Sequence, residues 1–84
     1  MNIAVVGLGF VGLSISSVLA SKNYNVIGID IDNQKCSDIR NGVLPLFEPD
    51  LENTLKIGLK KKLTISNNFS LINNCDMIFV SVGT

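Results

Sequence analysis

The sequence predicts an α/β fold in which helices cover a parallel sheet, and three observations carry this prediction. Two apolar runs, residues 3–6 and Met77–Val80, are continuous rather than alternating, which is typical of strands covered on both faces. Between them, short apolar segments alternate with segments of helical spacing. A Gly-x-Gly-x-x-Gly pattern at residues 7–12 stands where the first strand would turn into the first helix. We therefore expect a doubly wound sheet with right-handed crossovers and strand order 3-2-1-4.

The first expected helix, residues 10–22, carries the apolar side chains that would cover the sheet. Val11, Ile15, Val18 and Leu19 recur at helical spacing, so we expect this set to lie against the strands. The serines of the same helix are small and would allow close approach of a neighbour. The other expected elements are a first strand at Asn2–Val6, a second at 25–30, a helix that follows Asp32 or Asn33 and runs to about 40, a helix at 51–60, a third strand at Leu63–Ser66, a brief helix ending at 74 and a fourth strand at 76–82.

Polar residues before the later helices are candidate N-caps. Asp32 or Asn33 would cap the second helix, Asp50 the third, and Ser66 or Asn68 the brief fourth. Between the second and third helices, residues 43–50 contain two prolines, which exclude a regular helix or a central strand. This loop also carries Leu44, Leu46 and Phe47, so we expect it to fold back on the domain.

Composition excludes several classes of protein. The 84 residues suit one small domain, and seven basic residues balance seven acidic ones, which leaves no electrostatic footprint for nucleic acid or an anionic membrane. The chain has no histidine, and its two cysteines, Cys36 and Cys75, form no CxxC pair, so we expect no metal site and no disulfide framework. The apolar first twenty residues lack a cationic start and contain three glycines, unlike a signal peptide. No apolar run is long enough to span a membrane.

The glycine pattern has the residue types that a dinucleotide-binding turn of the Rossmann kind requires. Gly7 permits a tight turn, Gly9 lets a pyrophosphate approach the main chain, and Gly12 lets the helix pack close to the strand. The N–H groups and positive dipole end of the helix would then face the anion. Asp30 follows Gly12 by 18 positions, near the spacing expected for a carboxylate on the adenosine ribose. The alternative for Asp30 is a cap at the end of the strand.

Two other features leave alternatives open. Gly28, in a strand interior, marks close approach either of the adenosine side of a cofactor or of the packed helix. The run Lys60-Lys61-Lys62 is interpreted as a solvated helix end that offsets the dipole, with phosphate binding as the less favoured alternative.

Four stretches together resemble the amino terminus of the nucleotide-sugar 6-dehydrogenases, namely residues 2–13, 27–32, 42–49 and 78–84. The Pro-x-Phe-Glu-Pro block at 45–49 is the most specific of these, because ordinary Rossmann domains do not carry it. The resemblance implies an NAD-dependent, two-step oxidation of a sugar C6 alcohol to a carboxylate. Because the family is much longer, it implies that residues 1–84 are the N-terminal part of an NAD-binding Rossmann domain, with the catalytic residues elsewhere.

The resemblance also implies which residues contact NAD. Val11 would contact the pyrophosphate, Asp30 the adenosine ribose, Lys35 would lie beside that ribose, and Thr84 would approach the nicotinamide side. The alternatives are a core role for Val11 and an ordinary exposed position for Lys35. A carboxylate at Asp30 would repel the 2′-phosphate of NADP. The expected cofactor-binding residues are Gly7, Gly9, Phe10, Val11, Gly12, Asp30, Lys35 and Thr84.

The sequence leaves the sugar undecided. We expect UDP-glucose as substrate, with GDP-mannose or UDP-N-acetylmannosamine as alternatives within the family. A non-catalytic nucleotide-sensing Rossmann domain explains the glycine turn equally well but not the proline block. Two departures from the family pattern are Asp50, where a glycine is usual, and Gly83, where asparagine or proline is common. The resemblance further implies a cytoplasmic enzyme that is a homodimer or a larger oligomer, without nucleic-acid or membrane partners.

Overall fold

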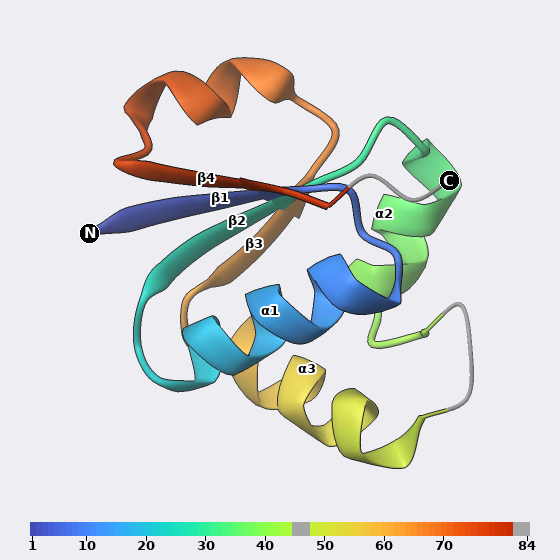
Figure 1. Ribbon diagram of the computed structural model, residues 1–84. Coiled ribbons are helices and arrows are strands. Elements are labelled where there is room, and N and C mark those ends of the chain that lie inside the picture. The colour runs from blue at the N-terminus through green and yellow to red at the C-terminus, as the bar shows by residue number, and fades with distance from the viewer. Residues whose placement is uncertain (45–47, 82–84) are drawn as a thin grey trace.

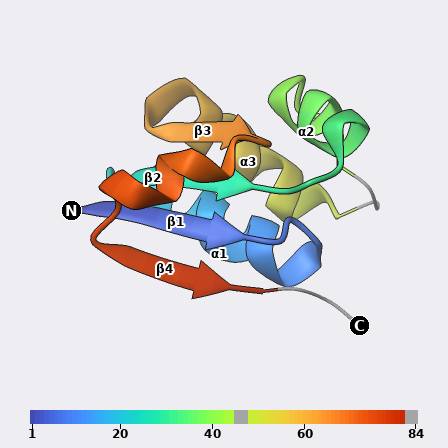
Figure 2. The ribbon, with the colours of Figure 1, turned by 90° about the horizontal axis from the view of Figure 1, so that it is seen from above.

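Four parallel strands form one sheet with the order β3-β2-β1-β4, as the sequence predicted (Figures 1 and 2). The computed structural model describes residues 1–44 and 48–81. The register places Val5 of β1 between Gly28 of β2 and Phe79 of β4. The elements are β1 (Asn2–Val6), α1 (Phe10–Ser21), β2 (Asn25–Ile29), α2 (Asn33–Arg40), α3 (Pro49–Lys61), β3 (Leu63–Ser66), the 3₁₀ helix η1 (Phe69–Asn74) and β4 (Met77–Val80).

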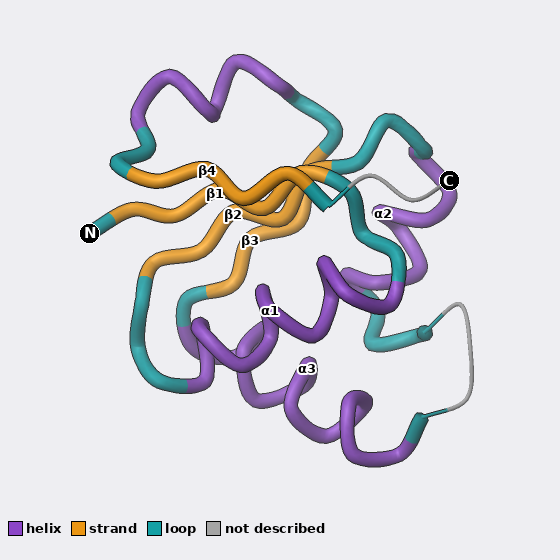
Figure 3. Tube along the Cα trace, in the orientation of Figure 1, coloured by secondary structure: helices purple, strands orange, loops and turns teal. Residues whose placement is uncertain are grey.

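Helices α1 and α3 lie side by side on one face of the sheet, and η1 lies on the opposite face (Figures 1 and 3). Helix α2 packs beside β3. This arrangement follows from right-handed crossovers, because the chain moves outward from β1 to β3 and then returns across β1 to reach β4. The carboxyl ends of all four strands therefore meet at one edge of the sheet, where the turn after β1 also lies (Figure 2).

The face that α1 buries differs from the predicted one. Val11 is 58% exposed and Val18 is 42% exposed, so the prediction that they lie against the sheet is wrong. Ile15 and Leu19 pack partly against the core as expected. The buried positions of α1 are mostly small and are Gly12, Leu13, Ser16, Ser17 and Ala20.

Contact with α3 explains this choice of face. A Cβ placed on Gly58 of α3 would lie 3.2 Å from the Ala20 Cβ and 3.4 Å from the Ser17 carbonyl oxygen. Only small side chains permit two helices to approach so closely, and the helical periodicity of larger apolar residues did not reveal that contact. On the α3 side, the predicted stripe is confirmed, because Leu51 and Leu55 are buried and Leu59 packs against the core.

Gly28 is explained by packing. A Cβ on this residue would lie 3.0 Å from Ile65 Cδ1 and 3.1 Å from Leu8 Cδ2. The space beside β2 is therefore filled by side chains of β3 and of the turn after β1. Leu8 and Ile65 are themselves fully or almost fully buried. Neither of the two alternatives weighed for Gly28 named these neighbours.

The expected N-caps are confirmed at α2 and η1, and the expected N-cap of α3 is wrong. The Asp32 carboxylate accepts the Lys35 N–H at 3.0 Å, and the Asn68 side chain accepts the Ser70 N–H at 3.1 Å. The prediction of Asp50 as a cap is wrong, because α3 begins at Pro49 and Glu48 holds the N-cap position. Proline suits the first helical position, since its fixed φ is already helical and its missing N–H is not needed there.

The proline loop is described only at its two sides. Leu44 packs partly against the core, which agrees with the prediction that this segment folds back. Leu46 and Phe47 lie outside the described residues. At the other end of α3, Lys60, Lys61 and Lys62 are exposed, as expected for a solvated helix end, and Lys61 Nζ donates to the Ser21 carbonyl oxygen at 3.2 Å.

Strand β4 forms an edge of the sheet and is exposed along its whole length. Beside it, Phe79 joins Ile15, Val18 and Leu19 of α1 in lining an apolar hollow of about 460 Å³. Within residues 1–44 and 48–81, the core thus lies between β3, β2, β1 and the helices α1, α2 and α3, with Cys36 and Ile39 as the contribution of α2. No helix in this described part has the length and apolar character to cross a bilayer.

Candidate dinucleotide site

The turn between β1 and α1 is held in place by main-chain geometry that suits glycine. Gly7 has a φ of +96°, in the left-handed region where a side chain is strained. Its N–H donates to the Ile29 carbonyl oxygen at 2.8 Å, which ties the end of β1 to the end of β2. The first helical bond of α1 runs from the Leu13 N–H to the Gly9 carbonyl oxygen at 2.9 Å. The chain therefore turns sharply at Gly7 and enters α1 three residues later, at Phe10.

Gly9 and Gly12 differ in the space that their surroundings leave for a side chain. A Cβ on Gly12 would lie 1.8 Å from the Gly7 carbonyl oxygen, so the helix approaches the turn as closely as a bare Cα allows. A Cβ on Gly9 would meet nothing within 4 Å, so this position borders open space. The close packing expected at Gly12 is therefore present, and Gly9 leaves its main chain open to a ligand.

The start of α1 leaves main-chain donors for an anion. Gly9 is the N-cap and has no side chain, so no side-chain oxygen caps the first turn. The N–H groups of Phe10, Val11 and Gly12 belong to this turn, where the helix itself supplies no acceptor. The first turn contains no acidic residue that would repel a phosphate. These N–H groups can donate to the oxygens of a diphosphate.

Asp30, just after β2, is bonded directly to the turn. Its Oδ2 accepts the Leu8 N–H at 2.9 Å, and its Oδ1 accepts the Asp32 N–H at 3.0 Å. Lys35 Nζ lies 3.6 Å from Oδ2. The Asp30 side chain is only 12% exposed. Each carboxylate oxygen has two lone pairs, so Asp30 keeps acceptor capacity for a ribose hydroxyl. Asp30 can therefore cap the end of β2 and contact a ribose at the same time.

The surroundings hold Asp30 in its ionised form. Partial burial by itself raises the pKa of this carboxyl, but hydrogen bonds from the Asp32 and Leu8 N–H groups and the Lys35 ammonium together outweigh burial. The net result is a pKa below the ordinary value for aspartate. The site thus presents a fixed negative charge beside the glycine turn.

A hollow of about 380 Å³ brings several predicted residues together. Of the predicted set, Gly7, Gly9, Asp30 and Lys35 line it. Prediction from sequence missed its other lining residues, which are Val6, Leu8, Ile31, Phe69 and Ser81. The sequence signal for Ile31 was an apolar residue between two aspartates in an otherwise polar stretch. Phe69 gave no comparable signal, because an aromatic residue at the start of a short helix resembles ordinary core.

Three other predicted residues, Phe10, Val11 and Gly12, do not line this hollow. Val11 is on α1 and largely exposed, so the alternative of a core role does not hold for it. Phe10 is also exposed, and it lines a second hollow with Glu48, Asp50 and other residues of α1 and α3. Thr84 lies outside the described residues.

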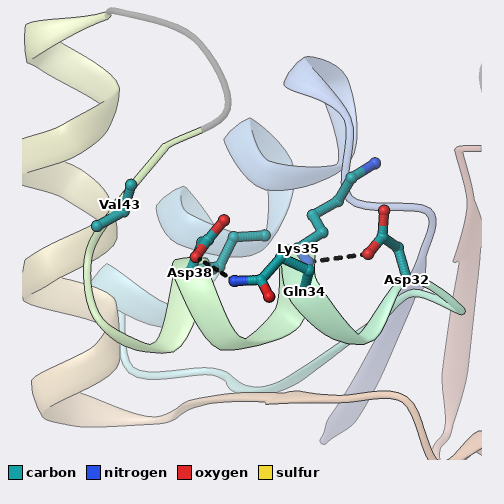
Figure 4. A pocket seen from close by; sticks show the side chains of 6 residues that line it. Asp32, Gln34, Lys35, Asp38 and Val43 are labelled. Carbon is teal, nitrogen blue, oxygen red and sulfur yellow. Dashed lines mark hydrogen bonds between the residues drawn. The ribbon is translucent and has the colours of Figure 1, made fainter.

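A neighbouring hollow of about 220 Å³ runs along α2 and is drawn in Figure 4. Among its lining residues, Gln34 Nε2 donates to Asp38 Oδ1 at 2.9 Å, and Asp32 lies at the start of α2 (Figure 4). Lys35 lines this hollow as well as the first, and its side chain extends away from Asp38 (Figure 4). Among the described residues, Lys35 is thus the one side chain that lines both hollows.

Both cysteines, Cys36 and Cys75, are free thiols that are at least partly buried. Cys36 is fully buried, with its Sγ 3.5 Å from both the Asp30 and the Ser66 carbonyl oxygens. Burial raises the pKa of the Cys36 thiol, which keeps it protonated and unreactive. Cys75 is half-buried, with its Sγ 3.6 Å from the Leu71 carbonyl oxygen. In residues 1–44 and 48–81, no three metal-ligating side chains lie together.

Fold and site together define a dinucleotide-binding α/β domain, with strand order 3-2-1-4, a glycine turn after β1 and a carboxylate after β2. Comparison with known proteins gives the family. Residues 1–84 match the UDP-glucose/GDP-mannose dehydrogenase family, NAD binding domain, and the chain belongs to this family. The resemblance found in the sequence is therefore confirmed, and so is NAD as the cofactor of the family's domain.

Relatives and solved structures agree with this membership. The chain is 39% identical to the UDP-glucose 6-dehydrogenase TuaD of Bacillus subtilis over 85 residues, which cover 99% of the chain and 18% of TuaD. It superposes on GDP-mannose dehydrogenase from Pseudomonas aeruginosa with a TM-score of 0.92 and 34% identity, covering 100% of the chain and 20% of that protein. For UDP-D-ManNAc dehydrogenase from Pyrococcus horikoshii the TM-score is 0.91 at 32% identity, with 98% and 20% covered. The chain spans a fifth or less of the length of these relatives.

The two glycines offer a matched pair of substitutions. We expect Gly12→Ala to lower the free energy of unfolding by several kcal/mol, because the new Cβ cannot coexist with the Gly7 carbonyl oxygen at 1.8 Å. Gly9→Ala should change it by no more than about 0.5 kcal/mol, because its Cβ enters open space at an ordinary φ of −74°. Denaturant unfolding of both variants measures this difference. Equal stability of the two would contradict the close packing at Gly12.

Asp30 should also make stability depend on pH. Because its folded-state pKa is depressed, the ionised carboxylate stabilises the fold above the ordinary aspartate pKa of about 4, and this contribution is lost as pH falls through the folded-state pKa. We expect the parent to be more stable than Asp30→Asn at about pH 6, and the difference to shrink toward about pH 2. Chemical denaturation across this range measures it. A difference that stays constant with pH would show that ionisation of Asp30 contributes nothing to the fold.

Proposed function

We propose that residues 1–84 are the N-terminal part of the NAD-binding domain of an enzyme that oxidises the C6 alcohol of UDP-glucose to a carboxylate, using two NAD. The single observation that carries the binding proposal is the Leu8–Asp30 hydrogen bond, which joins the glycine turn to an ionised carboxylate within one hollow. The UDP-glucose assignment is supported by identity to TuaD. The catalytic residues lie outside this chain, whose two thiols are buried or half-buried and structural.

The proposed placement of the diphosphate follows from the donors at the start of α1. Gly7 shapes the turn, Gly9 leaves room for the phosphates, and the N–H groups of Phe10, Val11 and Gly12 bind their oxygens. The exposed position of Val11 supports this role, because the residue is accessible from solvent.

The proposed placement of the adenosine ribose follows from Asp30. Its carboxylate accepts the ribose hydroxyls with the lone pairs that the Leu8 and Asp32 N–H groups leave free, and Lys35 lies beside them. A 2′-phosphate would meet this negative charge, so NAD is preferred to NADP. Thr84 completes the proposed set on the nicotinamide side.

The bulk of the enzyme would lie outside residues 1–84. The exposed β4 and the apolar hollow between Phe79 and α1 support this proposal, because such surfaces are normally covered in a larger domain. Following the family resemblance, we also propose a homodimer or larger oligomer in the cytoplasm, where Cys36 and Cys75 stay reduced. The nucleotide sugar would be bound mainly by residues beyond this chain.

Two alternative substrates are kept because relatives of similar identity carry them in their names. The chain is 37% identical to GDP-mannose 6-dehydrogenase of Pseudomonas syringae, and 42% identical over 61 residues to UDP-N-acetyl-D-mannosamine dehydrogenase of Methanococcus vannielii. The hollow beside Asp30 does not distinguish them, because it would hold the cofactor rather than the sugar.

Formation of NADH by the full-length protein tests the proposal. We expect NADH to form with UDP-glucose, with two NADH produced per sugar oxidised, and little NADPH to form when NADP replaces NAD. GDP-mannose and UDP-N-acetylmannosamine serve as the parallel substrates. NADH formation with one of these instead would reassign the sugar within the family. Binding of NAD without oxidation of any nucleotide sugar would overturn the enzymatic proposal.

A further inference from the structure

The dipeptide Asn41-Gly42, which follows α2, is the one asparagine–glycine pair in residues 1–84. Asparagine is a chemically labile residue, because a neighbouring main-chain nitrogen can displace its side-chain amide. The displacement is least hindered when glycine follows, since glycine has no Cβ to obstruct the approach. The other asparagines of the chain all precede larger residues. Asn41 is also exposed to solvent, so the sequence and its position both favour loss of its amide.

In the folded chain, the nitrogen that would attack is already bonded within the cap that ends α2. The Gly42 N–H donates to the Ile39 carbonyl oxygen at 2.9 Å, and the Val43 N–H donates to the Asp38 carbonyl oxygen at 2.8 Å. Gly42 has a φ of +79°. These two bonds and the left-handed glycine between them form a Schellman motif, which satisfies carbonyl groups at the end of a helix.

The conformation of Asn41 keeps its side chain away from that nitrogen. Asn41 has a ψ of 6°, whereas closing a ring with the Gly42 nitrogen requires a large rotation about this bond. Asn41 Nδ2 also donates to the Ser37 carbonyl oxygen at 3.0 Å, which holds the side chain against the last turn of α2. The reaction therefore requires that the cap open, because both hydrogen bonds must break and ψ must change.

We propose that Asn41 is a site of spontaneous deamidation and that the C-terminal cap of α2 restrains the reaction until the cap opens. In the opened chain, the Gly42 nitrogen attacks Asn41 Cγ and forms a cyclic imide. The Cγ–Nδ2 bond breaks, and Nδ2 leaves as ammonia with the proton that the Gly42 nitrogen gives up. Water then cleaves the imide at Cγ, which yields aspartate, or at the main-chain carbonyl carbon, which yields isoaspartate. No group is oxidised or reduced, and the proposed cofactor takes no part.

Neither product can restore the cap. An ionised carboxylate at position 41 has no N–H to donate to the Ser37 carbonyl oxygen, and its charge lies at the negative end of the α2 dipole. Isoaspartate also lengthens the main chain by one atom, which displaces the Gly42 and Val43 N–H groups from their acceptors. Deamidation thus turns a temporary opening of the end of α2 into a permanent one.

Mass spectrometry of the full-length protein, incubated in mildly alkaline buffer, measures the reaction as a gain of one mass unit in the peptide that carries position 41. We expect Asn41 to react roughly tenfold or more slowly in the folded parent than in urea-unfolded protein, because the cap must first open. Asn53 is the internal comparison, since it is exposed and precedes the β-branched Thr54. It should react more slowly than Asn41 in urea.

A pair of variants at Val43 tests the role of the cap. Val43→Pro removes the N–H that donates to the Asp38 carbonyl oxygen and leaves Asn41 and Gly42 in place. We expect it to speed deamidation of the folded protein by roughly 3- to 10-fold, the factor that corresponds to loss of one hydrogen bond. Val43→Ala is the matched control, because it keeps the N–H and the Val43 side chain is 53% exposed. Its rate should equal that of the parent.

Each result decides one part of the inference. No deamidation of Asn41 in urea would overturn the site. Equal rates in the folded and unfolded parent, or equal rates in folded Val43→Pro and Val43→Ala, would overturn its protection by the cap. If Val43→Pro does not fold, amide hydrogen exchange of the parent decides instead. Slow exchange of the Gly42 and Val43 N–H groups would support the cap, and exchange as fast as in an unfolded chain would contradict it.

Discussion

The hydrogen bond from the Leu8 N–H to the Asp30 carboxylate is the contact on which the site depends. It joins the turn after β1 to the tip of β2 at 2.9 Å, beside the main-chain bond from Gly7 to Ile29 at 2.8 Å. The Leu8 side chain is fully buried and lies against the bare face of Gly28. One residue therefore anchors the turn in the core and orients its main chain toward the carboxylate. The core packing and the polar site are built by the same few atoms.

Most of the fold was predictable from the sequence because parallel strands and the glycine turn leave strong local signals. Strand order and element order were predicted, with boundaries differing by one or two residues. The face of α1 was not predicted, because the closeness of α3 depends on small residues at Ser17, Ala20 and Gly58 that carry no hydrophobic periodicity. Asp50 failed as a cap because α3 starts at Pro49, which places the N-cap two residues earlier, at Glu48.

The site was predictable in part. The spacing of Gly12 and Asp30 predicted that turn and carboxylate would meet, and the structure places both at one edge of the sheet. Ile31 and Phe69 were not predicted, because they reach the hollow from different elements that only the sheet order brings together. The expected contact at Lys35 depended on family resemblance, and the structure adds its position 3.6 Å from Asp30.

A crystal structure of the full-length protein with NAD bound is the most direct test of this account. It should show diphosphate oxygens accepting hydrogen bonds from the N–H groups at the start of α1 and ribose hydroxyls on Asp30. The Leu8–Asp30 hydrogen bond should be unchanged, since the site is formed before the cofactor enters. NAD bound at another position, with the turn after β1 unoccupied and Asp30 contacting protein groups alone, would contradict the account.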